Sequence, residues 1–168
     1  MKAVAELLNQ MKKAGVIHDY AFFGAVAQMR YTEPVATLDA DVLVLLKEPV
    51  GLDALSPIYR YCREQGYSPS GESIQVGEWP VQFIPTFSAL TEEAVREAET
   101  DEIEGVQVRV VSAAHLAVIA LSVGRAKDFA RILALLEAGA VSLESVEALA
   151  ARHGLSAQWQ AFKRKFLE

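Results

Sequence analysis

The sequence predicts an α/β (α+β) fold, in which a mixed β-sheet with flanking helices is followed by a C-terminal bundle of helices. Two observations predict this fold. Before residue 112, short apolar runs of strand length alternate with segments of helical periodicity, and after residue 112 every segment has the helical period. Glycines also follow several predicted helices, where a left-handed residue suits a helix C-terminus. We therefore expect an α/β domain over residues 1–111 and a helical subdomain over residues 112–168 packed on it.

The first part of the chain alternates between the two kinds of element. Apolar spacing predicts helices over residues 2–14, 25–30 and 53–65, and strands over residues 20–23, 40–46, 73–76, 81–84 and 106–111. Lys47-Glu48-Pro49 is expected to end the second strand, and residues 77–80 are expected to form a tight turn. Thr91 is a predicted N-cap, with Glu92 and Glu93 in the first turn of its helix.

The last part of the chain is predicted to be helical throughout. Ser112 can cap a helix over residues 113–123, and a second helix covers residues 127–137. Ser142 caps a third helix that ends at Gly154, and Ser156 begins a last one. Four helices joined by short loops favour a compact bundle.

The composition limits the class of protein. The 168 residues fit one domain, or one domain with a small helical appendage, and 52% of them are hydrophobic. A net charge of −6 argues against non-specific binding to nucleic acid, which needs a basic surface, but a local basic cleft stays open. The single cysteine, Cys62, excludes an internal disulfide and is expected to be a core residue. Without a signal-like or membrane-spanning apolar run, we expect a cytoplasmic protein with no membrane partner.

Asp39-Ala40-Asp41 opens the apolar run 42–46 and is the first candidate site. Residues two apart on a strand project from the same face, so the two carboxylates repel each other there. They become favourable when a divalent cation lies between them, and Mg²⁺ is usually held by one or two carboxylates with substrate phosphates. The alternative is a polar turn before the strand, since aspartate is common in turns.

A second candidate lies upstream of the aspartates. The predicted strand 20–23 runs into Gly24-Ala25 and a short helix, and this geometry exposes backbone N–H groups that attract phosphate. A phosphate-binding turn followed by a carboxylate pair indicates a site for a nucleoside triphosphate with Mg²⁺.

Several segments together resemble a known family. Gly24-Ala25-Val26-Ala27, the segments 37–41 and 111–116, and Gly124-Arg125-Ala126-Lys127-Asp128 are similar to the nucleotidyltransferase superfamily, which has a DNA polymerase β-like fold. The resemblance covers roughly residues 18–136 and is strongest to small bacterial and archaeal members related to the toxins of type IV toxin–antitoxin systems.

The resemblance implies a role for each matching residue. Asp39 and Asp41 would be the catalytic pair and would hold Mg²⁺, which neutralises phosphates and activates the attacking hydroxyl. The remaining nucleotide-binding residues would be Gly24, Ala25, Thr37, Arg125, Lys127 and Asp128. The reaction would transfer a nucleotidyl group from an NTP to a hydroxyl and release pyrophosphate. A tRNA end, a protein side chain and a small molecule are all open as acceptors, and an antitoxin protein is an implied partner.

The sequence also departs from the family pattern. Active relatives commonly have a third carboxylate on a neighbouring strand, where this chain has Gln82, a neutral amide that cannot accept a proton. Glu72 or Glu78 could replace the missing acid. Relatives also tend to have a lysine near Ile119 or Ala120. The rival hypothesis is therefore an inactive member of the fold that binds a nucleotide or a protein partner.

Other polar residues are assigned simpler roles. His115 is interpreted as a helix residue near the junction of the two parts, and His18 and His153 as solvated residues. The acidic run 92–104 is interpreted as a solvated surface, and Trp159 as a packing residue.

Overall fold

The computed structural model of the chain describes residues 1–48 and 51–168. Pro49, predicted to help end a strand, lies outside these described residues. The helices are α1 (Lys2–Lys13), α2 (Gly24–Gln28), α3 (Ser56–Glu64), α4 (Ala89–Arg96), α5 (Ala113–Val123), α6 (Ala126–Glu137), α7 (Leu143–Arg152) and α8 (Ser156–Phe166). The strands are β1 (Asp19–Phe22), β2 (Ala40–Leu45), β3 (Ser68–Ser70), β4 (Ser73–Val76), β5 (Trp79–Pro85), β6 (Glu99–Ile103) and β7 (Val106–Val110).

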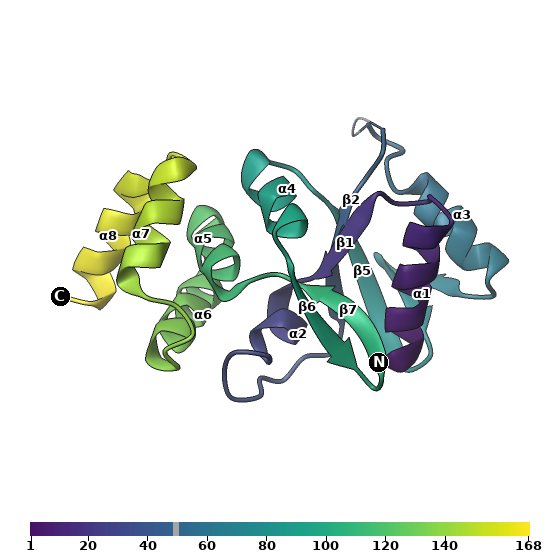
Figure 1. Cartoon of the computed structure of the whole chain (residues 1–168), viewed down its shortest axis with the longest axis horizontal. Helices are drawn as coiled ribbons and strands as arrows, with labels where there is room; N and C mark the ends of the chain where they lie inside the picture. Colours follow the sequence, from purple (N-terminus) through teal and green to yellow (C-terminus); the bar gives the residue numbers. More distant parts are fainter. Residues whose placement is uncertain (49–50) are drawn as a thin grey trace.

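The strands form one mixed sheet in the order β3-β4-β5-β2-β1-β7-β6 (Figure 1). β2 pairs antiparallel with β1 and parallel with β5, while β1 pairs parallel with β7. β2 is thus near the centre of the sheet, and Val42, Leu43 and Val44 are fully buried. The continuous apolar run of this strand has the pattern expected for a strand covered on both faces. The predicted mixed α/β fold is confirmed.

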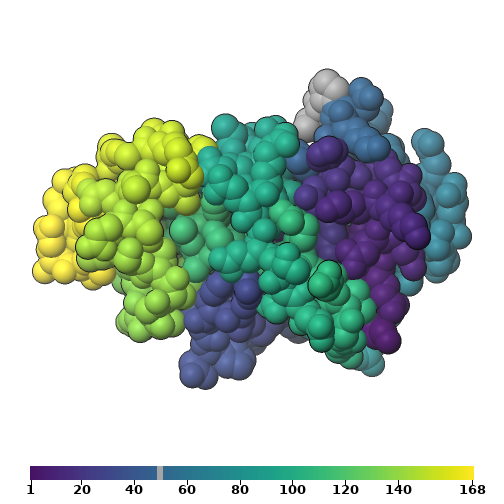
Figure 2. All heavy atoms as spheres, in the orientation of Figure 1, coloured from purple at the N-terminus to yellow at the C-terminus, as the bar shows by residue number. Residues whose placement is uncertain are grey.

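Four helices make the C-terminal bundle, and α5 is its central element. α5 is apolar on nearly all sides and is buried over most of its length, as expected for a helix enclosed by neighbours. It contacts α6, α7 and α8, and on the other side α2 and α4. Figure 1 shows this bundle at one end of the molecule and α1 and α3 at the other, and in Figure 2 the segment with α4 lies between them. The division at residue 112 stays a prediction.

Two strands were not predicted from the sequence. β6 reads Glu-Thr-Asp-Glu-Ile and lies at the edge of the sheet, so its acidic side chains stay in water and no apolar alternation marks it. β3 is a short exposed strand at the opposite edge. Most acidic residues of the run 92–104 are exposed, as expected, but part of the run is a strand and the side chain of Glu93 is only 20% exposed.

Two local predictions were wrong. The turn between β4 and β5 contains only Gly77 and Glu78, since Trp79 already pairs with Val76 in the sheet. The N-cap of α4 is Ser88, and Thr91 is the third residue of the helix. Thr91 N donates to Ser88 Oγ at 3.2 Å and Ser88 N donates to Thr91 Oγ1 at 3.0 Å, so the two residues form a capping box.

Candidate functional site

A cleft of about 330 Å³ lies between one end of the central strands and the helices α5 and α6. Its lining combines two acidic and three basic side chains with an apolar wall. The lining residues are Phe23, Gly24, Asp41, Gln82, Ile84, Phe87, Ile119, Ala120, Val123, Arg125, Lys127, Asp128 and Arg131. The fold thus brings the start of α2, β2, β5 and the start of α6 to one place.

Five of the eight predicted site residues line this cleft. They are Gly24, Asp41, Arg125, Lys127 and Asp128. The other three, Ala25, Thr37 and Asp39, are not in its lining. Residues about one hundred positions apart in the sequence therefore meet at the end of the sheet.

Gly24 and Asp41 are in close contact, and the contact requires glycine. The φ angle of Gly24 is +59°, a left-handed value that glycine adopts readily. A Cβ atom at this position would lie 2.4 Å from Asp41 Oδ2, well inside van der Waals contact. The backbone N–H of Phe23, just before Gly24, donates to the carbonyl oxygen of Asp41 at 2.9 Å. The turn into α2 is therefore built directly against the aspartate.

Asp41 lies in an environment that disfavours its charge. Burial raises its pKa, and the negative charge of Asp39 raises it further, while Arg131, Lys127 and Arg125 act in the opposite direction. A divalent cation would remove the repulsion between the two carboxylates, and oxygen ligands of this kind suit Mg²⁺. Two carboxylates of this kind fit a divalent cation held by Asp39 and Asp41, and the absence of a Cβ at Gly24 leaves room for the Asp41 carboxylate.

Asp39 lies immediately before β2, and Thr37 fixes its backbone. Thr37 Oγ1 donates to the carbonyl oxygen of Asp39 at 2.8 Å, and Asp39 N lies 3.4 Å from the same hydroxyl. Asp39 is thus held in a bend of the preceding loop. The contact of Thr37 is with this loop and not with the cleft itself.

Gln82 is the direct neighbour of Asp41 on the adjacent strand. In the parallel pairing of β2 with β5, Asp41 is in register with Gln82, and both line the cleft. This is the kind of position that the family resemblance gives to a third carboxylate. Glu72 and Glu78 are exposed residues of turns beside β4 and are not in the cleft lining. Neither glutamate therefore supplies the missing acid at this position.

The start of α6 contains an ion pair that faces the cleft. Arg125 Nε donates to Asp128 Oδ2 at 2.7 Å, and Arg125 N donates to the same oxygen at 3.1 Å. Burial raises the pKa of Asp128, but the bonds from Arg125 outweigh it and the pKa is lowered. Asp128 therefore caps α6 and compensates Arg125, which leaves Lys127 as a cation of this segment without such a partner among the described residues.

Arg131 is a cleft residue that the sequence analysis missed. It lies one turn after Lys127 on α6, and Arg131 Nε donates to Gln28 Oε1 at 2.9 Å. Burial lowers its pKa, because the surroundings disfavour a charged group. The i, i+4 spacing from Lys127 was the available signal, since such residues share a helix face.

The remaining wall of the cleft is apolar. Ile119, Ala120 and Val123 of α5 line it, and Phe87 contributes a ring that is 62% exposed. Ile119 and Ala120 are the positions near which the family resemblance leads us to expect a lysine. Among the described residues, the cations that line the cleft are Arg125, the N-cap of α6, and Lys127 and Arg131 of α6.

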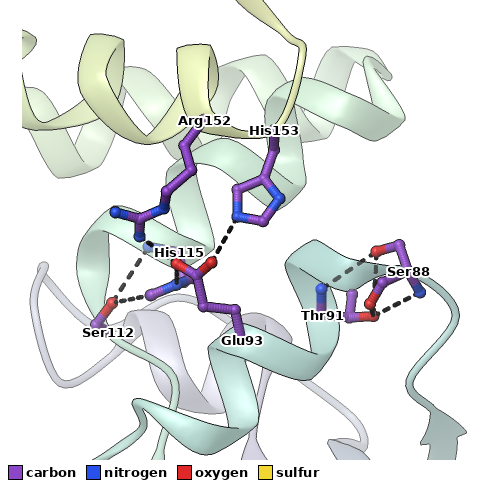
Figure 3. Close-up of polar contacts among 7 residues, drawn as sticks. All are labelled: Ser88, Thr91, Glu93, Ser112, His115, Arg152 and His153. Carbon is purple, nitrogen blue, oxygen red and sulfur yellow. Dashed lines mark hydrogen bonds and ion pairs between the residues drawn. The ribbon is translucent and has the colours of Figure 1, made fainter.

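A second polar cluster joins three helices away from the cleft (Figure 3). Glu93 of α4 accepts from His115 Nε2 of α5 at 3.1 Å and from His153 Nε2 at 2.8 Å, and it also accepts from Arg152 at the end of α7. Ser112 Oγ lies 2.8 Å from His115 Nδ1. His115 thus lies where α5 packs against α4. His153 is partly buried and bonded, so its predicted solvation was wrong.

The pKa of Glu93 shows how strongly this cluster favours a carboxylate. Burial raises the pKa, but the hydrogen bonds from Arg152, His115 and His153 outweigh burial and lower it to about 2. Glu93, Glu97 and His115 are the one group of three metal-type donors among the described residues, with ligand atoms within 4.8 Å of one another. Arg152 donates to the same Glu93 oxygen as His115, so a cation already lies there and the group is an ionic cluster.

Comparison with known proteins identifies the fold. No protein-family model matches the chain, and no curated protein matches it. The solution structure of the antibiotic-resistance factor ANT(2'')-Ia is similar with a TM-score of 0.53 and 15% identity, over 98% of this chain and 96% of that chain. The crystal structure of an antigenic nucleotidyltransferase-like protein from Paracoccidioides brasiliensis is similar with a TM-score of 0.54 and 16% identity, over 95% of this chain and 91% of that chain.

No helix among the described residues is long and apolar enough to cross a membrane.

The similarities to these two solved structures bear on fold alone, because both sequence identities are low. The sheet, the helical bundle and the similar structures together show that the chain has a nucleotidyltransferase-type fold.

Proposed function

We propose that the protein is a nucleotidyltransferase that binds an NTP with Mg²⁺ in the cleft and transfers the nucleotidyl group to a hydroxyl acceptor. The observation that carries the proposal is the convergence of Gly24, Asp41 and the cations of α6 in one cleft, within a fold of this class. Carboxylates for a metal and cations for phosphates are the two charges that such a reaction needs.

Each part of the cleft has a role in this proposal. Asp39 and Asp41 would hold the Mg²⁺ ion, which when bound neutralises phosphate charge and activates the acceptor hydroxyl. Gly24 and Ala25 would offer backbone N–H groups to phosphate oxygens. α2 has only five residues, so these N–H groups and not a large helix dipole would make the contact. Lys127 and Arg131 would add positive charge from α6.

Gln82 favours a second candidate, in which the cleft binds a nucleotide without turnover. An amide in register with Asp41 can donate or accept a hydrogen bond, but it cannot take a proton from the acceptor. The protein would then bind a nucleotide, or a protein partner, through the same residues. The two candidates share the binding step and differ in transfer.

We further propose that the two parts of the chain, separated at the predicted boundary at residue 112, supply different groups to the cleft. The domain over residues 1–111 would supply the carboxylates and the backbone N–H groups, and the subdomain over residues 112–168 would supply the cations. A tRNA end, a protein side chain and a small molecule are the proposed acceptors, and an antitoxin protein is a proposed partner by resemblance.

A transfer assay tests this proposal. The protein is incubated with α-labelled NTPs and Mg²⁺ together with total cellular RNA, total protein or a small-molecule extract. Label in one fraction supports the transferase and identifies the acceptor class, whereas nucleotide binding without label supports the second candidate. Label that persists in Asp39→Asn and Asp41→Asn variants would show that the proposed site is wrong.

A further inference from the structure

We propose that Arg131 binds the phosphate groups of the ligand and that Gln28 is the residue that positions it. The inference rests on the proposed nucleotide-binding function and adds two residues that the family resemblance does not assign. It starts from a hydrogen bond between side chains 103 positions apart, which joins α2 to α6 beside the cleft.

Gln28 is held in place at the end of α2. The residue is 6% exposed, and its Oε1 accepts the hydrogen bond from Arg131 Nε. Its amide nitrogen lies 3.5 Å from Thr32 Oγ1, a contact that sets which amide atom faces Arg131. A buried glutamine with its oxygen directed at an arginine fixes the plane of the guanidinium.

The partner of Arg131 is neutral, and this is the decisive feature. Arg125, the neighbouring arginine of α6, has its charge compensated by Asp128. Within residues 1–48 and 51–168, no carboxylate lies within ion-pair distance of Arg131. Gln28 therefore orients the guanidinium and leaves its positive charge available to a ligand.

A half-buried cation whose hydrogen-bond partner is neutral is stabilised further when an anion binds. Burial lowers the pKa of Arg131 even though the negative charges of Asp128 and Asp41 favour its protonated form, so its charge is poorly solvated. Only its Nε has a hydrogen-bond partner among the described residues, so both terminal nitrogens can donate. A planar guanidinium donates two parallel hydrogen bonds to phosphate oxygens. Arg131 lines the same cleft as Gly24 and Asp41, where the triphosphate of the proposed ligand would lie.

The test measures binding of two probes by calorimetry with Mg²⁺ present: an NTP and inorganic tripolyphosphate. Arg131→Gln is compared with Arg63→Gln, which removes the same charge from an exposed position on α3. We expect Arg131→Gln to weaken binding of both probes by roughly 10- to 100-fold, the loss typical of a charge-assisted hydrogen bond. Arg63→Gln should bind both probes like the wild type.

Two substitutions of Gln28 separate positioning from packing. Gln28→Leu removes the acceptor and should weaken triphosphate binding several-fold. Gln28→Glu keeps an acceptor and compensates the charge of Arg131, so the melting temperature should hold or rise while triphosphate binding still weakens. A purely structural role would leave binding by Gln28→Glu unchanged.

The outcomes distinguish this inference from the proposed function. If folded Arg131→Gln or Gln28→Glu binds the NTP as tightly as the wild type, the inference is wrong and the proposed function stands. If the wild type binds tripolyphosphate through Arg131 but binds no NTP, the proposed function is wrong and the phosphate role of Arg131 stands. If the wild type binds neither probe, both are overturned.

Discussion

Replacing Gly24 by alanine tests whether the turn into α2 is built against Asp41. A non-glycine residue in the left-handed region costs about 1–2 kcal/mol, and the φ of Gly24 is +59°. The new Cβ would also lie 2.4 Å from Asp41 Oδ2, and moving that carboxylate off its rotamer costs about 0.5–1.5 kcal/mol more. We therefore expect Gly24→Ala to lower the free energy of unfolding by about 1.5–3.5 kcal/mol, the sum of these two terms.

The chain supplies a matched control for the first of these terms. Gly77 has a φ of +61° and nothing within 4 Å of its hypothetical Cβ, so Gly77→Ala carries the backbone strain without the overlap. It should cost about 1–2 kcal/mol. In an Asp41→Ala background the cost of Gly24→Ala should fall to that same range, while the cost of Gly77→Ala should not change.

Chemical denaturation of the wild type, the three single variants and the two double variants with Asp41→Ala gives these free energies. Calorimetry gives the binding of Mg²⁺–NTP. Displacement of Asp41 by the new methyl group should also weaken nucleotide binding in Gly24→Ala. If Gly24→Ala costs the same in both backgrounds, or costs no more than about 0.5 kcal/mol, the contact between Gly24 and Asp41 is not what fixes this turn.

Three further predictions concern the charges of the two sites. The pKa of Asp41 is raised in the folded state, so ionisation of this carboxyl destabilises the metal-free fold as the pH rises above the usual pKa of 3.8. Asp41→Asn should therefore increase the free energy of unfolding at pH 7 and abolish Mg²⁺-dependent nucleotide binding. A variant that loses both stability and nucleotide binding would contradict this reasoning. The pKa of Glu93 is lowered from 4.5 to about 2, so its contribution is complete above pH 4.5 and is lost as pH falls toward 2. Glu93→Gln should therefore cost about 1.5–3 kcal/mol at pH 7 by denaturation. Glu102→Gln, which removes the same charge from an exposed position on β6, should cost under about 0.5 kcal/mol, and equal costs would exclude the cluster as the cause. Gln82→Glu places a carboxylate in register with Asp41. It should raise the rate of nucleotidyl transfer in a labelling assay by roughly 100-fold or more, because a general base typically accelerates such a step by at least this factor. An unchanged rate would mean that Gln82 does not limit turnover.

The sequence predicted the elements whose signals are local. The α5 boundaries follow from Ser112 and Gly124, which cap the helix as expected. β2 was predicted because a central strand, covered on both faces, has a continuous apolar run. β6 was missed because an edge strand in water carries no apolar alternation, and its acidic residues were interpreted only as a solvated surface.

The candidate site was predictable only where its residues belong to recognisable motifs. Gly24 and Asp41 were expected to act together, and the structure places them in contact. Arg131 was not expected, since nothing in the local sequence shows that this position of α6 faces a glutamine of α2. The partners of Glu93 come from α5 and α7, and only the packing of the helices brings them together.

The most direct test of the central claim is a calorimetric titration of the wild type with each NTP, with and without Mg²⁺, repeated on the Asp39→Asn/Asp41→Asn double variant. The account predicts that at least one NTP binds the wild type more tightly with Mg²⁺ present, and that this gain is lost in the folded double variant. Absence of NTP binding to the wild type with Mg²⁺, or a metal-dependent gain that survives in the double variant, would contradict the assignment of the cleft.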